Sequence, residues 1–156
     1  MKAKYTAIQV ANWFLSSSSM SPKKLQKMLY YAYAWVLTLT NDNKDNLDNR
    51  LFDDDRFEAW VHGPVLPNIY QEFKIFGYEE IPARKANDSV GFTPDIEGIL
   101  KQVQEVYGGY TADELESITH QEAPWKNARN GYSPIELCQK EISDRDIYDC
   151  YIQRVA

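Results

Sequence analysis

The apolar positions of the first forty residues repeat at the spacing of an α-helix. In residues 5–15 and again in 22–40, apolar side chains recur every three or four positions, which predicts two helices separated by the four serines at 16–19. Ser21 and Pro22 supply an N-cap followed by proline at the first helical position, so the second helix is expected to begin there. Because Tyr and Trp cover its remaining faces, we predict that this helix is the buried centre of the fold.

The later helices are expected to begin at proline or capping residues. Pro67, Pro94 and Ser143 each precede an apolar pattern of helical period, and Thr111 with its following Glu114 forms a capping box. The polar stretches 41–50 and 82–93 separate these blocks and are predicted to be loops.

Strand character is confined to a short stretch in the middle of the chain. Residues 51–52 and 57–61 are apolar or aromatic, and the sequence DDDR between them could form the turn, which predicts a small β-hairpin at about 51–61. Gly63 and Pro64 then form a predicted corner, at which Gly63 needs a positive φ or a close neighbour. The expected fold class is therefore mainly α, a compact single-domain helical fold with a small β-hairpin.

Length and composition favour one globular domain over residues 1–156. With 44% hydrophobic and 26% charged residues, the chain is large enough for an independent core. No stretch predicts a membrane span or a signal peptide, so we expect a cytoplasmic protein without a membrane partner. The two cysteines, Cys138 and Cys150, lack the spacing of a disulfide framework or a zinc knuckle, which agrees with a reducing compartment.

Charge is distributed unevenly along the sequence. The net charge is -6, yet residues 1–41 contain five lysines and no acid. The acidic remainder argues against nucleic acid as a partner. Lys23, Lys24 and Lys27 lie close together on the second helix. They either form a cationic rim for a protein partner or bond groups of their own domain, and we favour the internal bonds.

No complete catalytic or metal-binding motif is present in the sequence. His120 and Glu122 form an H-x-E pair, which is half of a zinc deaminase signature, but the P-C-x-x-C half is missing. A zinc site would need His62, His120 and a carboxylate or cysteine to converge. The structural alternative for His120 is a ring that bonds the last carbonyls of a helix. Without a phosphate-binding glycine loop either, we expect no catalytic residues, no metal and no cofactor.

Three blocks of sequence together resemble a known family. They are PKKLQKMLY at 22–30, FEAWVHGPV at 57–65 followed by Tyr70, and THQEAPW at 119–125. In this order they are similar to the Panacea domain, the SocA-like antitoxin family also called phage-associated GepA-like proteins. The resemblance covers nearly the whole chain. Its structural motif residues are Pro22, Leu25, Gln26, Tyr30, Gly63, Pro64, Tyr70 and Pro124.

The resemblance implies an antitoxin of a bacterial or prophage toxin–antitoxin pair, with no enzymatic activity. Such a protein neutralises a cognate toxin by direct binding, either by sequestering it or as an adaptor that delivers it to a cellular protease. The alternative function is a small metal-dependent hydrolase or another enzyme that uses His120 and Glu122. The candidate partner-binding residues are Lys24, Lys27, Trp60, His62, His120 and Trp125. For Trp60 and Trp125, core packing is the alternative that we favour.

Overall fold

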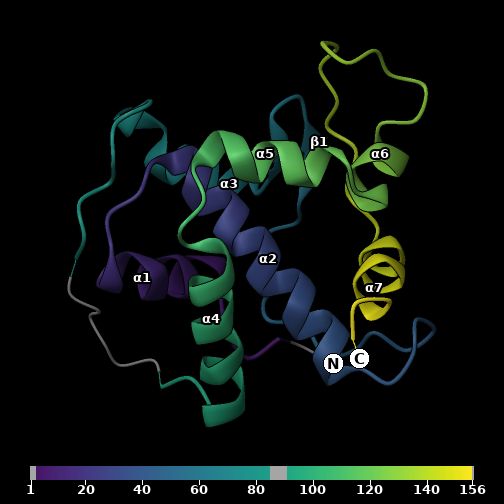
Figure 1. The fold of residues 1–156 in the computed structure, drawn as a ribbon, viewed down its shortest axis with the longest axis horizontal. Helices are drawn as coiled ribbons and strands as arrows, with labels where there is room; N and C mark the ends of the chain where they lie inside the picture. Colours follow the sequence, from purple (N-terminus) through teal and green to yellow (C-terminus); the bar gives the residue numbers. More distant parts are fainter. Residues whose placement is uncertain (1–2, 85–90, 156) are drawn as a thin grey trace.

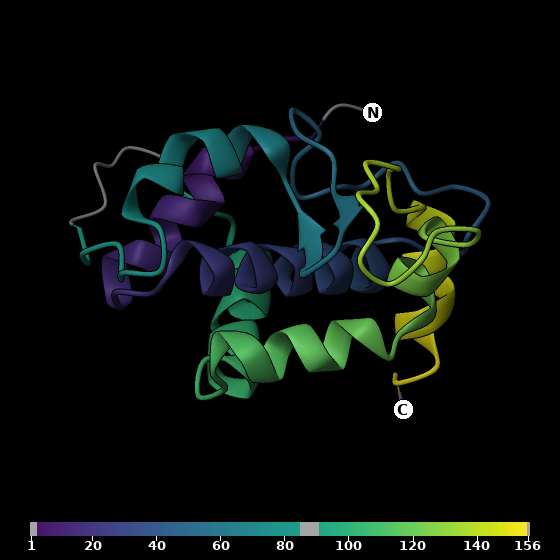
Figure 2. The same ribbon diagram turned by 90° about the horizontal axis from the view of Figure 1, so that it is seen from above.

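A long central helix organises the fold, and the other elements pack around it. The computed structural model describes residues 3–84 and 91–155. Helix α2 (Pro22–Thr40) begins where it was predicted, because the Ser21 side chain accepts a hydrogen bond from the backbone N–H of Lys24. Figure 2 shows α2 running through the middle, with α4 and α5 on one side and α1, α3 and a hairpin on the other. The prediction that this helix is the buried centre is confirmed.

The surrounding helices also begin near their predicted starts. Capping boxes open α1 (Ala7–Ser17) and α5 (Ala112–His120), and the Ser143 side chain caps α7 (Asp144–Ile152). Proline occupies the first turn of α3 (Pro67–Phe73) and of α4 (Pro94–Tyr107), and a 3₁₀ turn η1 (Lys74–Phe76) continues α3. The caps of α5 and α7 and the proline starts of α3 and α4 are local and were predicted from the sequence, whereas the capping box of α1, at Thr6, was not.

The small antiparallel sheet lies further along the chain than predicted. Strand β1 (Glu58–Trp60) pairs with β2 (Gly63–Val65), with Ala59 opposite Pro64, so the hairpin spans 58–65 and not 51–61. The corner predicted at Gly63 and Pro64 is wrong, because both residues belong to β2, and the φ of 113° at Gly63 lets the chain reverse directly after His62. Proline lacks a backbone N–H, and Pro64 is tolerated because β2 is an edge strand. The other edge of β1 is hydrogen-bonded to the segment 140–142.

The DDDR segment caps helices instead of closing a hairpin. Asp54 accepts a hydrogen bond from the backbone N–H of Ala7 (2.9 Å), at the start of α1. Asp55 accepts two from the first turn of α3, at Asn68 (3.0 Å) and Ile69 (3.2 Å). Carboxylates are stabilised at helix N-termini, where backbone N–H groups lack partners. These contacts join residues far apart in sequence, and this explains why the turn prediction was wrong.

The segment after α5 differs from the prediction, whereas the predicted loops agree with it where they are described. A short helix α6 (Ala123–Ala128), which was not predicted, follows α5 directly. The predicted loop at 41–50 is confirmed, and residues 82–84 and 91–93 are also irregular, while 85–90 lie outside the described residues. Figure 1 shows α5 crossing the upper part of the molecule toward α6, with α7 below α6 on the right.

Aromatic side chains dominate the core around α2. Tyr30 lies edge to face against Phe57, with ring centroids 5.3 Å apart, and Tyr31 stacks on Tyr107 at 3.8 Å. Both tyrosines are almost fully buried, which matches the aromatic faces predicted for this helix. In the described ranges, no helix combines the length and the apolar character that a membrane span requires.

Candidate functional site

The hairpin is held tightly against α2 by its glycine. A Cβ at Gly63 would lie 2.7 Å from Cε of Lys27 and 3.1 Å from Oγ1 of Thr119, so there is no room for a larger residue without movement. The positive φ at Gly63 independently favours glycine. Both predicted reasons for a glycine at this position are therefore found: the backbone has a positive φ, and neighbouring atoms lie too close for a side chain.

Gln26 and Lys27, two consecutive residues of α2, form hydrogen bonds with the backbone of the hairpin and of the residue after it. Gln26 donates to the carbonyl of Leu66 (3.1 Å) and accepts from its backbone N–H (2.8 Å). Lys27 is only 1% exposed, and its amine donates a long hydrogen bond to the carbonyl of Pro64 (3.5 Å). Burial lowers the pKa of Lys27 to about 7, the nearby charge of Lys23 adds to this effect, and Glu116 opposes it. In this structure Lys27 is thus an interior residue and not part of an exposed cationic rim.

The neighbouring lysines bond groups of their own chain, as we favoured from the sequence. Lys24 donates to the carbonyl of Gly108 at the end of α4 (2.6 Å). Lys23 pairs with Asp113 (2.7 Å) and with Glu116, both on α5. These bonds tie the first turn of α2 to α4 and α5, and the charge of Lys23 is offset by two acids.

Four of the six candidate residues meet on one face beside the hairpin. The ring of His120, the last residue of α5, stacks on Trp125 with centroids 4.0 Å apart and planes inclined by 15°. The indole N–H of Trp125 donates to the backbone carbonyl of Trp60 (2.8 Å). His62, whose side chain is 73% exposed, approaches Glu116 with Nδ1 3.3 Å from Oε2. We call this cluster of Trp60, His62, Glu116, His120 and Trp125 the hairpin face.

The histidine environment differs from both sequence interpretations. Desolvation lowers the pKa of His120, although the charge of Glu116, 4.0 Å from its Nε2, acts in the opposite direction. The ring stacks on Trp125 and does not cap the last carbonyls of α5 as suggested. Glu116 was missed by the sequence reasoning. Its position four residues before His120 on a capped helix is the signal that could have found it.

The carboxylate of Glu122 bonds side chains in and just after α7, and not the histidines. One carboxylate oxygen accepts from the hydroxyl of Tyr151 (2.8 Å) and the other from Arg154 (2.7 Å). The carboxylate within ion-pairing distance of His120 is therefore Glu116, and the H-x-E pair does not assemble as an acid–base site. Within the described part of the chain, no group of three or more His, Cys, Asp and Glu side chains is arranged to hold a metal.

Five of the structural motif residues of the three blocks lie at helix starts or are buried. Pro22 and Pro124 lie in the first turns of α2 and α6, and Leu25, Tyr30 and Pro64 are buried. A residue that the sequence reasoning missed, Arg129, supports the hairpin by donating to the carbonyl of Ala59 (2.8 Å). Its guanidinium also lies over the ring of Trp125, 5.2 Å from the centroid.

An open groove of about 410 Å³ runs along the other side of the hairpin, between the first turns of α2 and α3 with η1. Apolar and aromatic side chains form its walls, and Trp60 meets Tyr70 edge to face at 5.0 Å. Tyr70 is 40% exposed and Tyr78, on the turn after η1, is fully exposed. We call this feature the α2–α3 groove. Its apolar and aromatic wall residues include Leu25, Trp60, Val65, Ile69, Tyr70 and Phe73.

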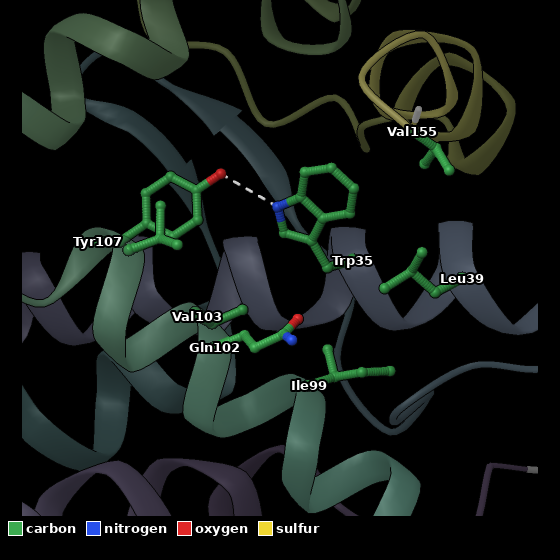
Figure 3. A pocket seen from close by; sticks show the side chains of 8 residues that line it. Trp35, Leu39, Ile99, Gln102, Val103, Tyr107 and Val155 are labelled. Atoms are coloured by element: carbon green, nitrogen blue, oxygen red, sulfur yellow. Dashed lines mark hydrogen bonds between the residues drawn. The ribbon is translucent and has the colours of Figure 1, made fainter.

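A second hollow, of about 280 Å³, lies between α2 and α4 near the end of the chain. Figure 3 shows Trp35 and Tyr107 side by side in it, joined by a hydrogen bond from the indole N–H to the tyrosine oxygen (3.0 Å). Leu39 and Val155 extend it outward. None of its lining residues is charged, and none belongs to the hairpin face or to the candidate residues.

Comparison with known proteins places these features in a family. The family model described as "Antitoxin SocA-like, Panacea domain" matches residues 25–126, about two-thirds of the chain. The chain belongs to this family. Within it, the antitoxin SocA of Caulobacter vibrioides is 29% identical over 157 residues, which cover 87% of this chain and 79% of that protein. No solved structure gives a significant match. The matched range includes the hairpin, the helices α3, α4 and α5, and most of α2 and α6.

Proposed function

We propose that this SocA-like protein is the antitoxin of a toxin–antitoxin pair and neutralises its toxin by direct protein contact. The observation that carries the proposal is the family match over 25–126, because that range contains the hairpin face and all the residues of the α2–α3 groove except Pro22 and Lys23. Trp and Tyr side chains, which are enriched at the energetic centres of protein interfaces, are partly exposed there, with Trp60 on the hairpin, Tyr70 on α3 and Trp125 on α6. The arrangement suits a binding protein better than an enzyme, since Glu122 and His120 do not act on a common site.

Neutralisation is tested with the product of the open reading frame next to the gene for this chain. That protein is expressed from an inducible promoter in a bacterial host, with or without this chain. We expect growth arrest when it is expressed alone, growth when both are present, and co-purification of the two proteins at a fixed ratio. A matched vector that carries a stop codon early in this chain serves as the control. Arrest that persists despite a well-folded, abundant chain contradicts the proposal.

The mode of neutralisation is sequestration in this proposal, and the protease adaptor is its alternative. A sequestered toxin keeps its abundance in the complex, whereas a toxin delivered to a protease disappears faster when the antitoxin is present. The half-life of the toxin after translation is stopped therefore separates the two modes. We expect an equal or longer half-life in cells that contain this chain, and a clearly shorter half-life indicates the adaptor mode.

A further inference from the structure

The α2–α3 groove carries charges of one sign in a chain whose net charge has the opposite sign. Every charged side chain that lines it is basic, namely Lys23, Lys27 and Lys74, while the chain as a whole has a net charge of -6. Lys23 is matched by acids of α5. Among the described residues, no carboxylate lies at ion-pairing distance from the buried Lys27 or the exposed Lys74. Because Lys27 is buried and its pKa is lowered to about 7, the exposed Lys74 is the residue that offers a partner full positive charge beside the apolar walls.

The walls of the groove are suited to receiving side chains of a protein. Its volume of about 410 Å³ falls in the range of roughly 300–1,000 Å³ that is typical of binding pockets. Tyr70 and Tyr78 stand exposed at its edge, and Ile75, on the same short segment, is 87% exposed. Large apolar side chains that gather around a concave surface mark interaction sites more often than isolated ones do.

We propose that the α2–α3 groove binds an amphipathic segment of the toxin whose apolar side chains enter the groove and whose flanking side chains are acidic. This inference rests on the proposed function, and it adds the location and chemistry of the contact. The apolar walls favour a protein segment over a nucleic acid, whose phosphates would need many cations along an open surface. Lys74 at the exposed end supplies the charge that attracts the acidic flanks, and Tyr70 and Tyr78 supply the aromatic contact area.

The test compares groove variants with surface variants matched in residue type. The binding partner is the purified product of the adjacent open reading frame, and the dissociation constant is measured by calorimetry. We expect Tyr70→Ala combined with Tyr78→Ala to raise Kd about tenfold or more. Tyr110→Ala is the control, because Tyr110 is 41% exposed, almost the same as Tyr70, but does not line the groove. Tyr78→Ala alone keeps the test valid if the double variant folds poorly.

Charge is tested separately with Lys74→Glu, and with Lys101→Glu on α4 as its control. We expect Lys74→Glu to slow association several-fold at low salt and to have a smaller effect at high salt, since screening weakens charge attraction. A photoreactive benzoylphenylalanine at position 78 should crosslink to a toxin segment in which apolar residues are flanked by Asp or Glu. A crosslinked segment flanked by Lys or Arg contradicts the proposed chemistry.

The possible outcomes separate the inference from the proposed function. If the wild-type chain does not bind the adjacent gene product at all, the proposed function fails. If the wild type binds and the groove variants bind equally well, the function stands and the groove inference is overturned. If the groove variants instead abolish self-association of the isolated chain, a second copy of this chain occupies the groove and the inference is also overturned.

Discussion

Replacing Lys27 by methionine should change how the stability of this protein depends on pH. Lys27 is 1% exposed and has one long hydrogen bond, to the carbonyl of Pro64. Burial lowers its pKa to about 7 in the folded chain, whereas an unfolded chain binds the same proton up to about pH 10.5. Between these values the unfolded state holds more protons than the folded state, so the free energy of unfolding rises with pH. The cost of burying this amine is fully present below pH 7 and is relieved above it.

The size of the effect follows from the two pKa values. A full proton difference gives about 1.4 kcal/mol for each pH unit. Because the folded amine is still about half protonated at pH 7, Lys27 should add about 2 kcal/mol of stability between pH 7 and pH 9. Methionine fills nearly the same space without a charge. We therefore expect Lys27→Met to lose this rise and to be at least as stable as the wild type at pH 7.

Urea unfolding followed by tryptophan fluorescence at pH 7, 8 and 9 measures the difference. Other titrating groups are common to both proteins, so the gap between the wild-type and variant curves isolates Lys27. Lys101→Met is the control, because the side chain of Lys101 is 70% exposed. Parallel pH profiles for the wild type and Lys27→Met would refute the assignment of Lys27 as a buried amine with a lowered pKa.

Two further predictions concern the supports of the hairpin face. Gly63→Val should lower the free energy of unfolding by about 2–4 kcal/mol, because it combines a strained φ with a clash at Lys27. Thermal denaturation against Gly109→Val, at a site with no atom within 4 Å of the new Cβ, checks this, and equal melting temperatures would contradict it. Glu122→Gln weakens the bonds to Tyr151 and Arg154 and should cost about 1–3 kcal/mol in urea unfolding. Glu105→Gln, at an exposed position, is the control and should leave the free energy of unfolding unchanged. Equal losses of free energy in both variants would show that the bonds of Glu122 contribute little.

The helices could be predicted because the signals that start them are local. Ser21 and Thr111 each bond a backbone N–H three residues away, so cap and helix lie within one stretch of sequence. The hairpin could not be placed in the same way. Its real turn depends on Gly63 fitting over Lys27, and the acidic run at 53–56 is used by helix starts elsewhere in the chain. A sequence pattern does not indicate which distant backbone group a carboxylate will meet.

The residue types of the candidate site could also be identified from the sequence, but their contacts across the fold could not. The sequence picked out Trp60, His62, His120 and Trp125, and the structure brings them together through contacts of more than fifty residues' separation, such as that of Trp125 with Trp60. It gave no sign that Lys27 would be buried, because a lysine on a helix is normally exposed. Glu116 was also overlooked: its spacing of four residues from His120 could be seen in the sequence, but its contact with His62, 54 residues away, depends on the fold.

The hairpin separates two surfaces, and this position has a consequence for binding. Trp60 contributes its ring to the α2–α3 groove and its carbonyl to the bond with Trp125 on the hairpin face. Because Gly63 and Arg129 hold the strands in place and Gln26 holds Leu66 directly after them, the hairpin wall of the groove keeps its shape without a partner, and binding need not order it. Loss of a groove side chain such as Tyr78 should then weaken binding without affecting the fold. Loss of a support such as Gly63 should weaken both, since the same strands shape the groove wall and the packing against α2.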